Sequence, residues 1–255
     1  MSAALPSVSL PPVLQMHGIG KRYGGVEVLT GIDLSVRAGE VLALVGPSGC
    51  GKSTLLGILS GLLPADAGSL IVEGVSAPQF GQWQRIAYMF QEDRLLPWRS
   101  VTDNIAFGLE AQGLSRAERD RRAVDALQLV GLADVARAWP HELSGGMRSR
   151  VALARSLAVR PSVLLMDEPF SKLDPQTRTQ MHAELLRIQA ASGTTIVFVT
   201  HDMEEAVVLA DRIVRLVPGP GRIADVIDLQ DLPRPRDPVS PPVAERVRTL
   251  RARTG

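Results

Sequence analysis

The chain has 255 residues, of which 45% are hydrophobic and 22% are charged, so it is large enough to bury one extended core or two smaller lobes. This composition excludes disordered, collagen-like and low-complexity proteins. The 28 basic and 27 acidic residues leave a formal net charge of +1. Because proteins that bind mainly to phosphate backbones carry a large basic surplus, we do not expect nucleic acid as the main partner.

The cysteine content and the N-terminus indicate the compartment. Cys50 is the single cysteine, so no intramolecular disulfide forms, as is typical of a reducing cytoplasm. Residues 1–13 contain three prolines and lack a basic cluster, so we expect a flexible N-terminal segment and not a signal peptide. The longest apolar runs have five residues, against about 20 for a membrane span, and we expect no membrane-spanning segment.

The hydrophobic patterns predict two kinds of strand. Residues 32–37 alternate between apolar and polar side chains, as in an antiparallel strand with one solvated face, and residues 70–72 are expected to add another. Four other runs are short and almost continuously apolar, which is typical of strands buried on both faces of a mostly parallel sheet: 41–45, 85–90, 163–166 and 195–200.

Helix signals lie between these runs. Ser115 begins an S-x-x-E capping box that opens a helix ending near Gly131, and Asp174 is an N-cap followed by proline at the first helical position. Residues 101–138 contain no strand pattern and are predicted to form a helical lobe. Residues 218–242 hold seven prolines, so we expect an irregular tail with a short edge strand near Val226, then a small helix at 243–251.

One glycine-rich segment has the sequence of a phosphate-binding loop. It fits G-x-x-x-x-G-K-[ST], follows the buried run 41–45 and leads into a helix, which is the context that this motif requires. Its glycines let backbone N–H groups surround a phosphate chain, while Lys52 reaches the outer phosphates and Ser53 offers its hydroxyl to Mg²⁺. The predicted nucleotide-binding residues are Gly46, Pro47, Ser48, Gly49, Cys50, Gly51, Lys52, Ser53 and Thr54.

The other buried runs also end in polar residues. Asp167 and Glu168 follow the run 163–166, where one carboxylate is suited to hold Mg²⁺ and the next to polarise an attacking water. Gln91 follows the run 85–90, and His201 follows 195–200. Because the carboxyl ends of parallel strands meet at one edge, we expect these side chains and Lys52 to line one crevice.

A second anion-binding helix start lies 92 residues beyond Lys52. Ser144 caps the predicted helix, and the glycines that follow it expose the first backbone N–H groups. One triphosphate does not need two such cradles from one subunit, whereas two facing subunits would use both. The segment consists of Leu143, Ser144, Gly145, Gly146 and Met147.

In order and spacing, these segments resemble the ATP-binding subunits of ABC transporters over nearly the whole chain. The resemblance implies an α/β fold: a P-loop NTPase core with a mostly parallel sheet, an N-terminal antiparallel β subdomain and an α-helical signature-motif lobe. It implies an ATPase domain over residues 14–240, with the lobe at about 101–158, and a helical tail over 241–255.

The same resemblance assigns roles to single residues. Tyr23 matches the aromatic that stacks on adenine, residues 143–147 match the signature motif, and Ser171 and Asp174 match the D-loop. Glu168 corresponds to the catalytic glutamate and His201 to the switch histidine. Gln91 corresponds to the glutamine that contacts Mg²⁺ and water, so the metal ligands would be Ser53, Gln91 and Asp167.

Cofactors and partners follow from the family. ATP and Mg²⁺ are implied, as is a head-to-tail homodimer in which the signature motif acts on the opposite subunit's ATP. A membrane permease, an extracytoplasmic substrate-binding protein and a place on the cytoplasmic face of the membrane are implied as well. Residues 94–98, 220–223 and 232–236 are similar to those of nitrate, sulfonate and taurine importers, and related importers for pyrimidine precursors share much of these segments.

Two positions depart from the family pattern, and the sequence disfavours two other functions. Ser149 stands where glutamine is usual, and Lys172 where alanine is usual, which affects details of interdomain contact and turnover. A soluble ABC ATPase acting on nucleic acid or ribosomes is disfavoured by the net charge and by the lack of a long heptad segment. A small-molecule kinase leaves the signature segment and His201 without a role.

Two further expectations concern single side chains. The cluster at 95–98 follows Gln91, so part of it is expected to receive a permease helix, the alternative being that Leu96 and Trp98 fill the junction between the lobes. Cys50 lies beside Lys52 near a helix start, which favours a reactive thiolate, the alternative being a buried, inert filler.

Overall fold

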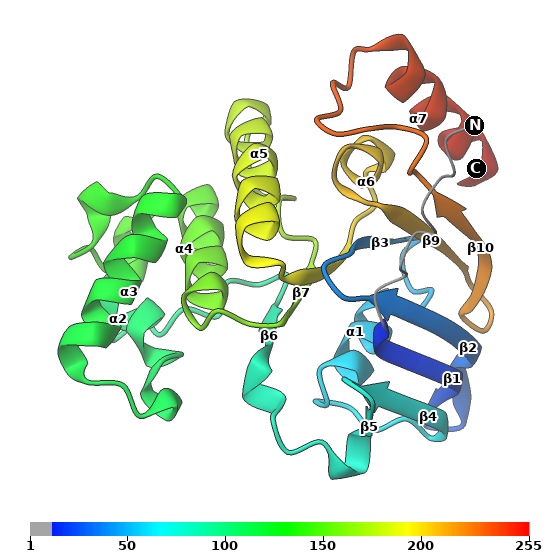
Figure 1. The fold of residues 1–255 in the computed structure, drawn as a ribbon, viewed down its shortest axis with the longest axis horizontal. Coiled ribbons are helices and arrows are strands. Elements are labelled where there is room, and N and C mark those ends of the chain that lie inside the picture. The colour runs from blue at the N-terminus through cyan, green and yellow to red at the C-terminus, as the bar shows by residue number, and fades with distance from the viewer. Residues whose placement is uncertain (1–11, 255) are drawn as a thin grey trace, which may run out of the picture.

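The structure is a computed structural model that describes residues 12–254. It has mixed α/β architecture with two sheets (Figure 1). The larger sheet has the strand order β10-β9-β3-β8-β7-β6, in which only β10 runs antiparallel to its neighbour. Its strands are β3 (Val41–Val45), β6 (Ile86–Met89), β7 (Val163–Asp167), β8 (Thr195–Val199), β9 (Arg212–Val217) and β10 (Arg222–Asp228).

The second sheet is antiparallel and has the order β2-β1-β4-β5. It lies next to α1, on the other side of β7 from the helical lobe (Figure 1). Its strands are β1 (Pro12–Tyr23), β2 (Val26–Arg37), β4 (Ala67–Val72) and β5 (Val75–Ser76).

Seven α-helices surround the sheets in the described residues. They are α1 (Lys52–Leu59), α2 (Val101–Phe107), α3 (Arg116–Leu129), α4 (Gly145–Ala158), α5 (Pro175–Ser192), α6 (Met203–Leu209) and α7 (Pro241–Thr254). Short 3₁₀ helices occupy Ala77–Gln79, Trp83–Arg85, Glu110–Gln112, Ala133–Val135 and Pro140–Glu142. None of the helices within residues 12–254 is long and apolar enough to cross a membrane.

Three of the four continuous apolar runs are fully buried strands, as predicted: β3, β7 and β8. The fourth run, 85–90, forms the edge strand β6, in which Ile86 and Tyr88 are only partly buried, so the prediction of burial on both faces is wrong there. In β3 all five side chains are buried. Val41, Ala43 and Val45 join a core shared with the helical lobe, whereas Leu42 and Leu44 join a core shared with α1 and the antiparallel sheet. Because successive side chains point to opposite faces, a strand covered on both sides needs apolar residues at every position.

The predicted helical lobe forms from α2, α3 and α4, with a serine at each helix start. Ser100, Ser115 and Ser144 accept hydrogen bonds from the backbone N–H of the third helical residue. Asn104 is fully buried and donates to the carbonyls of Leu96, Arg99 and Ser100. This asparagine therefore holds the 96–100 segment against α2.

The chain termini differ in part from the prediction. Strand β1 begins at Pro12, so residues 12 and 13 are not part of a flexible N-terminal segment, and residues 1–11 lie outside the described residues. The edge strand β10 includes Val226, as predicted, and α7 is longer than the predicted 243–251. Its Val243, Val247 and Leu250 are buried in the core shared with α6.

Three strands were not predicted: β1, the two-residue β5 and β9. Strand β1 contains two glycines and pairs with β2 through several register shifts, so its apolar residues do not alternate cleanly. Strand β9 carries Arg212 and Arg215, which pair with Glu40 and Asp225. Tertiary ion pairs make these arginines acceptable in a strand beside β3, and a local pattern does not reveal them.

The tail segment 232–236 supports α6. Arg236 is buried and donates to the carbonyls of Val207, Ala210, Leu229 and Leu232, while Arg234 donates to the Leu209 carbonyl. The last carbonyls of a helix lack intrahelical donors, and guanidinium groups satisfy them well. Both arginines thus act as a cap for the C-terminus of α6.

Candidate nucleotide site

The candidate site lies at the carboxyl edge of the larger sheet. Strands β3, β6, β7 and β8 are parallel and adjacent in the order given above, so the residues following them emerge at the same edge (Figure 1). Those residues are the glycine-rich loop, Gln91, the pair Asp167 and Glu168, and His201. The fold therefore brings together the residues that the sequence analysis selected.

The glycine-rich loop wraps around the Lys52 side chain. Lys52 Nζ donates hydrogen bonds of 2.8 Å to the carbonyls of both Gly46 and Pro47, and the side chain is buried. Helix α1 begins at Lys52 with Gly51 as its N-cap. The ammonium is thus held inside a loop whose backbone leads into a helix start, an arrangement that attracts phosphate.

Two glycines of the loop are required by its geometry. Gly46 has φ 152°, and a Cβ there would lie 2.5 Å from the Leu216 carbonyl oxygen. Gly51 has φ 94°, and a Cβ there would lie 2.5 Å from the Leu29 side chain. A larger residue at either position would clash as well as strain the backbone.

Glu168 stands between two polar partners. Gln91 Nε2 donates to Glu168 Oε2 at 3.1 Å, and His201 Nδ1 lies 3.5 Å from Glu168 Oε1. Glu168 also has φ 47°, a left-handed conformation that is uncommon for a residue with a side chain and is concentrated at functional sites. The carboxylate is therefore fixed by side chains that follow β6 and β8.

Asp167 is buried at the end of β7, beneath Ser53. Burial raises the pKa of the Asp167 carboxyl, while the nearby Ser53 hydroxyl and Lys52 ammonium favour its charged form. Ser53, Gln91 and Asp167 also line one groove. Hydroxyl, amide and carboxylate oxygens are the donors that Mg²⁺ prefers, so these residues fit that ion.

Tyr88 is a site residue that the sequence analysis missed. Its phenol interacts with the Asp167 carboxyl, and burial raises the pKa of the phenol. The Tyr88 ring also packs against Phe90, with centroids 4.3 Å apart, and the Arg94 guanidinium lies 3.7 Å from the Phe90 ring centroid. Tyr88 lies in β6 and Phe90 directly follows it, so the alternation of an extended chain places both rings on one face, but only the fold shows that Tyr88 meets Asp167.

The second predicted anion cradle begins α4 in the helical lobe. Ser144 Oγ accepts from the Met147 N–H at 3.2 Å, and Gly146 packs against Lys172 and Leu173. Helix α4 and α1 lie on opposite sides of β7 (Figure 1). The segment 143–147 thus adjoins residues 172–173 of its own chain rather than its own glycine-rich loop.

Two arginines connect α4 to the segment after Gln91. Arg148 Nε lies 3.1 Å from Asp93 Oδ2, and Arg155 donates to the carbonyls of Asp93 and Arg94. Ser149, one of the unusual positions, is buried and donates to the Gly145 carbonyl at 3.2 Å. Lys172, the other, is exposed.

Tyr23 lies at the tip of the β1–β2 hairpin and is 46% exposed. Lys21 Nζ lies 5.5 Å from its ring centroid and is paired with Asp66. Further along the same hairpin, Leu29 contacts the glycine-rich loop at Gly51. The hairpin thus carries an exposed aromatic ring on a strand pair that adjoins the loop.

Comparison with known proteins identifies the family. A family model described as "ABC transporter" matches residues 29–171, which is more than half of the chain. The chain belongs to the ABC transporter family. It is an ATPase of this family, and the ABC-type arrangement of a glycine-rich loop, acidic pair and signature segment was predicted from the sequence.

Two curated members of the ABC family show how similar this chain is to its relatives. The aliphatic sulfonates import ATP-binding protein SsuB 1 of Xanthomonas axonopodis pv. citri (strain 306) is 47% identical over 225 residues, which is 88% of each chain. The taurine import ATP-binding protein TauB of Escherichia coli O157:H7 is 42% identical over 217 residues, 85% of this chain and 84% of TauB.

Solved ABC structures confirm the fold class. A dimeric ATP-binding cassette, MJ0796, in a post-hydrolysis state bound to ADP and Pi, superposes with a TM-score of 0.78 at 28% identity. The match covers 85% of this chain and 99% of that one. The P-loop NTPase fold with an antiparallel β subdomain and a helical lobe is therefore established for this ABC protein.

The structure contradicts the expectation for Cys50, and the docking of a permease helix at 95–98 stays a prediction. Cys50 is fully buried, with Sγ 3.8 Å from Lys52 Nζ, so the expectation of an accessible thiol in this ABC ATPase is wrong. The loop turns this side chain inward beneath Gly46. Trp98 is 69% exposed and does not fill the junction between the lobes, whereas Leu95 is buried in the core.

Proposed function

We propose that this chain is the ATP-hydrolysing subunit of an importer for small sulfonate-type anions, a class that includes taurine and extends to nitrate. The observation that carries the proposal is the cluster of Lys52, Gln91, Asp167, Glu168 and His201 at one sheet edge. These residues provide a phosphate cradle, metal ligands and a carboxylate base within one site.

ATP binding is assigned to the glycine-rich loop and Tyr23. Backbone N–H groups of residues 46–54 and the start of α1 would surround the phosphates, with the Lys52 ammonium at the outer ones. The exposed Tyr23 ring is suited to stack on adenine. This arrangement supplies binding energy at both ends of the nucleotide.

Ser53, Gln91 and Asp167 are the proposed ligands of Mg²⁺. They line one groove beside the loop, and the raised pKa of Asp167 reflects a buried carboxyl that a cation would stabilise in its charged form. When bound, Mg²⁺ would neutralise charge on the β- and γ-phosphates. Tyr88 is a positioning residue that keeps the Asp167 carboxyl in place.

Glu168 is the proposed general base. Its carboxylate is oriented by Gln91 and lies 3.5 Å from His201, so it is ready to accept a proton from a water directed at the γ-phosphate. His201, at the end of β8, would contact that phosphate as the switch histidine. The left-handed backbone of Glu168 aims the carboxylate into the site.

Dimerisation completes the proposed site. The signature segment 143–147 adjoins its own D-loop and not its own glycine-rich loop, so a facing subunit is needed to use it. MJ0796, the similar cassette, is dimeric. Ser171 and Asp174 flank Lys172 and Leu173, which pack against Gly146, and are therefore proposed to contact the partner.

A permease and a substrate-binding protein are the remaining proposed partners. Trp98 is exposed on the segment that follows Gln91, and Gln91 donates a hydrogen bond to Glu168. A permease helix docked at Trp98 would therefore act, through Gln91, on the proposed catalytic carboxylate. The subunit would then lie on the cytoplasmic face of the membrane. The import of sulfonates and taurine by the relatives supports the cargo class.

The test combines hydrolysis with complex isolation. The purified chain is expected to hydrolyse ATP only when Mg²⁺ is present. A tagged chain is expected to co-purify from native membranes with a permease, and that permease is expected to take up taurine or an alkanesulfonate only when ATP is supplied. Failure to hydrolyse ATP would contradict the enzyme assignment. Co-purification with a permease that moves unrelated cargo would contradict the substrate class alone.

A further inference from the structure

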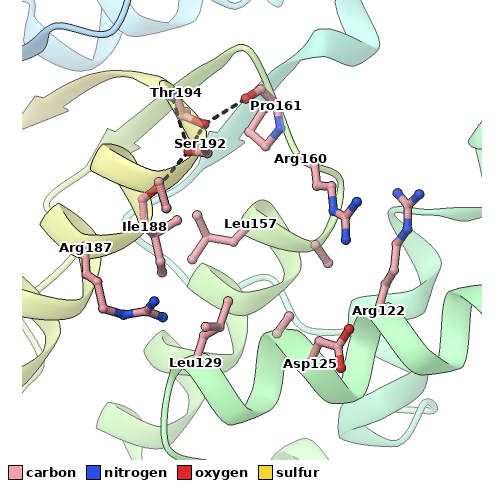
Figure 2. Close-up of a pocket in the computed structure, with 13 residues that line it drawn as sticks. Arg122, Asp125, Leu129, Leu157, Arg160, Pro161, Arg187, Ile188, Ser192 and Thr194 are labelled. Carbon is pink, nitrogen blue, oxygen red and sulfur yellow. Dashed lines mark hydrogen bonds between the residues drawn. The ribbon is translucent and has the colours of Figure 1, made fainter.

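A cleft on the opposite side of the core from the nucleotide site separates the helical lobe from α5. It is lined by residues of α3, the end of α4 and α5, together with the segments that lead into β7 and β8 (Figure 2). Pro161 and Thr194 precede those strands, so the cleft opens at the amino edge of the sheet. Its volume of about 460 Å³ is in the range of small-molecule sites.

The cleft has an apolar floor and a basic rim. Ala126, Leu129, Leu157, Ala158 and Ile188 supply aliphatic surface. The charged lining residues are the three arginines Arg122, Arg160 and Arg187 and one acid, Asp125. Figure 2 shows Arg122 and Arg160 on one side of the cleft and Arg187 on the other.

Within residues 12–254, Arg160 is the one of these three arginines without an acidic partner. Arg122 is paired with Glu118, and Arg187 with Glu184. The Arg160 guanidinium makes no hydrogen bond or ion pair with any side chain or carbonyl among residues 12–254, and Figure 2 shows it at the cleft. An arginine that lacks an internal partner beside an aliphatic surface is suited to an anionic ligand with an apolar tail.

The backbone of Arg160 presents this side chain at a conformational cost. Arg160 follows the C-cap of α4 and has φ 53°, the left-handed conformation in which helices usually end with glycine. Glycine at position 160 would therefore end α4 with less backbone strain than arginine does. The arginine contributes its charge to the cleft and not stability to the turn.

The walls of the cleft are fixed in the structure. Thr194 Oγ1 donates to the Pro161 carbonyl at 3.1 Å, and Ser192 Oγ donates to the Ile188 carbonyl at 2.8 Å (Figure 2). On the lobe side, Gln112 donates to the Val159 carbonyl at 3.0 Å. A ligand would thus enter a preformed site, and its binding would cost little conformational entropy of the protein.

We propose that this cleft binds a small organic anion with an aliphatic tail, the sulfonate or carboxylate head lying at Arg160 and the tail on the Leu129, Leu157 and Ile188 floor. Such a ligand would contact both the helical lobe and the core, and would stabilise their relative position. The proposal concerns a site separate from the nucleotide site and does not depend on the proposed transport function.

The test is calorimetric titration of the full-length protein with 1-hexanesulfonate. Saturable binding is expected, with a raised melting temperature. Methanesulfonate, which lacks the tail, and hexyltrimethylammonium, which reverses the charge, are expected to bind at least about tenfold more weakly. Absence of saturable 1-hexanesulfonate binding, or equal binding of the cationic compound, would overturn the proposal.

Four variants separate the ligand site from the stability of the fold. Arg160→Gly should relieve the backbone, keep or raise the melting temperature and weaken 1-hexanesulfonate at least about tenfold. Ala191→Trp should fill the cleft from the exposed face of α5 and also abolish binding, whereas Asp125→Asn should strengthen it. Arg222→Ala, which removes an exposed arginine on β10, is the control and should bind like the wild type.

The outcome that decides against the site is unchanged binding in Arg160→Gly. Equal weakening by Arg222→Ala would also overturn it, because the effect would then come from net charge. Mg²⁺-dependent ATP hydrolysis is measured on the same samples. Hydrolysis without hexanesulfonate binding contradicts the cleft proposal alone, and binding without hydrolysis contradicts the enzyme assignment alone.

Discussion

Gln91 Nε2 donates a 3.1 Å hydrogen bond to Glu168 Oε2, joining residues 77 positions apart in the sequence. Gln91 follows β6 and begins the segment that exposes Trp98, whereas Glu168 follows β7. The bond therefore connects a surface that a partner can reach with the carboxylate that we propose activates water. Substitutions of Trp98 and of Glu168 test the two ends of this connection separately.

Replacement of Glu168 by glutamine should abolish steady-state hydrolysis and preserve ATP binding. The amide keeps the shape of the side chain but does not accept a proton, and loss of a general base costs about 10² to 10⁴ in rate. Phosphate release and equilibrium nucleotide binding measure the two effects. Glu27→Gln, an exposed change on β2, is the control, and wild-type turnover by Glu168→Gln would disprove the role.

Lys52→Ala, unlike Glu168→Gln, should weaken the binding of ATP. The lysine is buried within the glycine-rich loop, where its ammonium would meet the phosphates. Equilibrium titration with a fluorescent ATP analogue measures the affinity. An unchanged dissociation constant would show that Lys52 serves only to close the loop.

Trp98→Ala should uncouple transport from hydrolysis without unfolding the subunit. Trp98 is 69% exposed, so its removal leaves no cavity, and the melting temperature should stay the same. Leu95→Ala, three residues earlier and buried, should instead lower the free energy of unfolding by about 2 to 5 kcal/mol. A Trp98→Ala protein with normal uptake in the reconstituted complex would exclude the docking role.

Cys50 should resist maleimide in the folded protein, with or without Mg-ATP. Its side chain is fully buried beneath the loop, so a reagent reaches it only when the loop opens. Mass spectrometry should find rapid stoichiometric labelling in denaturant and slow labelling in buffer. Rapid labelling of the native protein that ATP suppresses would show that the loop opens readily.

Asp174 should make the stability of α5 depend on pH. Its side chain accepts from the Thr177 N–H at 3.0 Å, and hydrogen bonding by Thr177 lowers the pKa of the carboxyl below its ordinary value of 3.8. A lowered pKa means that the stabilisation is present above pH 3.8 and is lost as the pH falls through the folded-state pKa.

Melting curves of Asp174→Asn and Asp174→Ala test this cap. Asparagine keeps the cap, so its melting temperature at neutral pH should stay close to that of the wild type, and alanine should lower it. The wild-type advantage over alanine should shrink in acid. An advantage that is constant at every pH would show that the charge contributes nothing.

Arg236→Ala should destabilise the protein by more than about 3 kcal/mol. Arg236 donates to four backbone carbonyls at the end of α6 and in the tail, and bonds from a charged donor contribute about 1.5 to 3 kcal/mol each. Arg236→Lys should recover little, because one ammonium does not reproduce the planar fork. Denaturant titration measures both, and full stability of Arg236→Lys would contradict the cap.

The sequence by itself determined the parts of the protein whose geometry is local. The strand, glycine turn and helix around Lys52 follow from residues that are neighbours in the chain, because positive φ angles and helix starts impose requirements within a few residues. The same holds for the serine caps of the lobe helices. Three of the four continuous apolar runs likewise predicted strands covered on both faces.

Only the tertiary structure decided which side chains are buried and which meet. Cys50 turns inward while Trp98, in an apolar cluster, points outward, and neither pattern reveals this. Tyr88 meets Asp167, and Arg236 meets the end of α6, because strands and loops from distant parts of the chain are adjacent. Burial and such contacts depend on what covers a surface, and that is set by long-range packing, not by local periodicity.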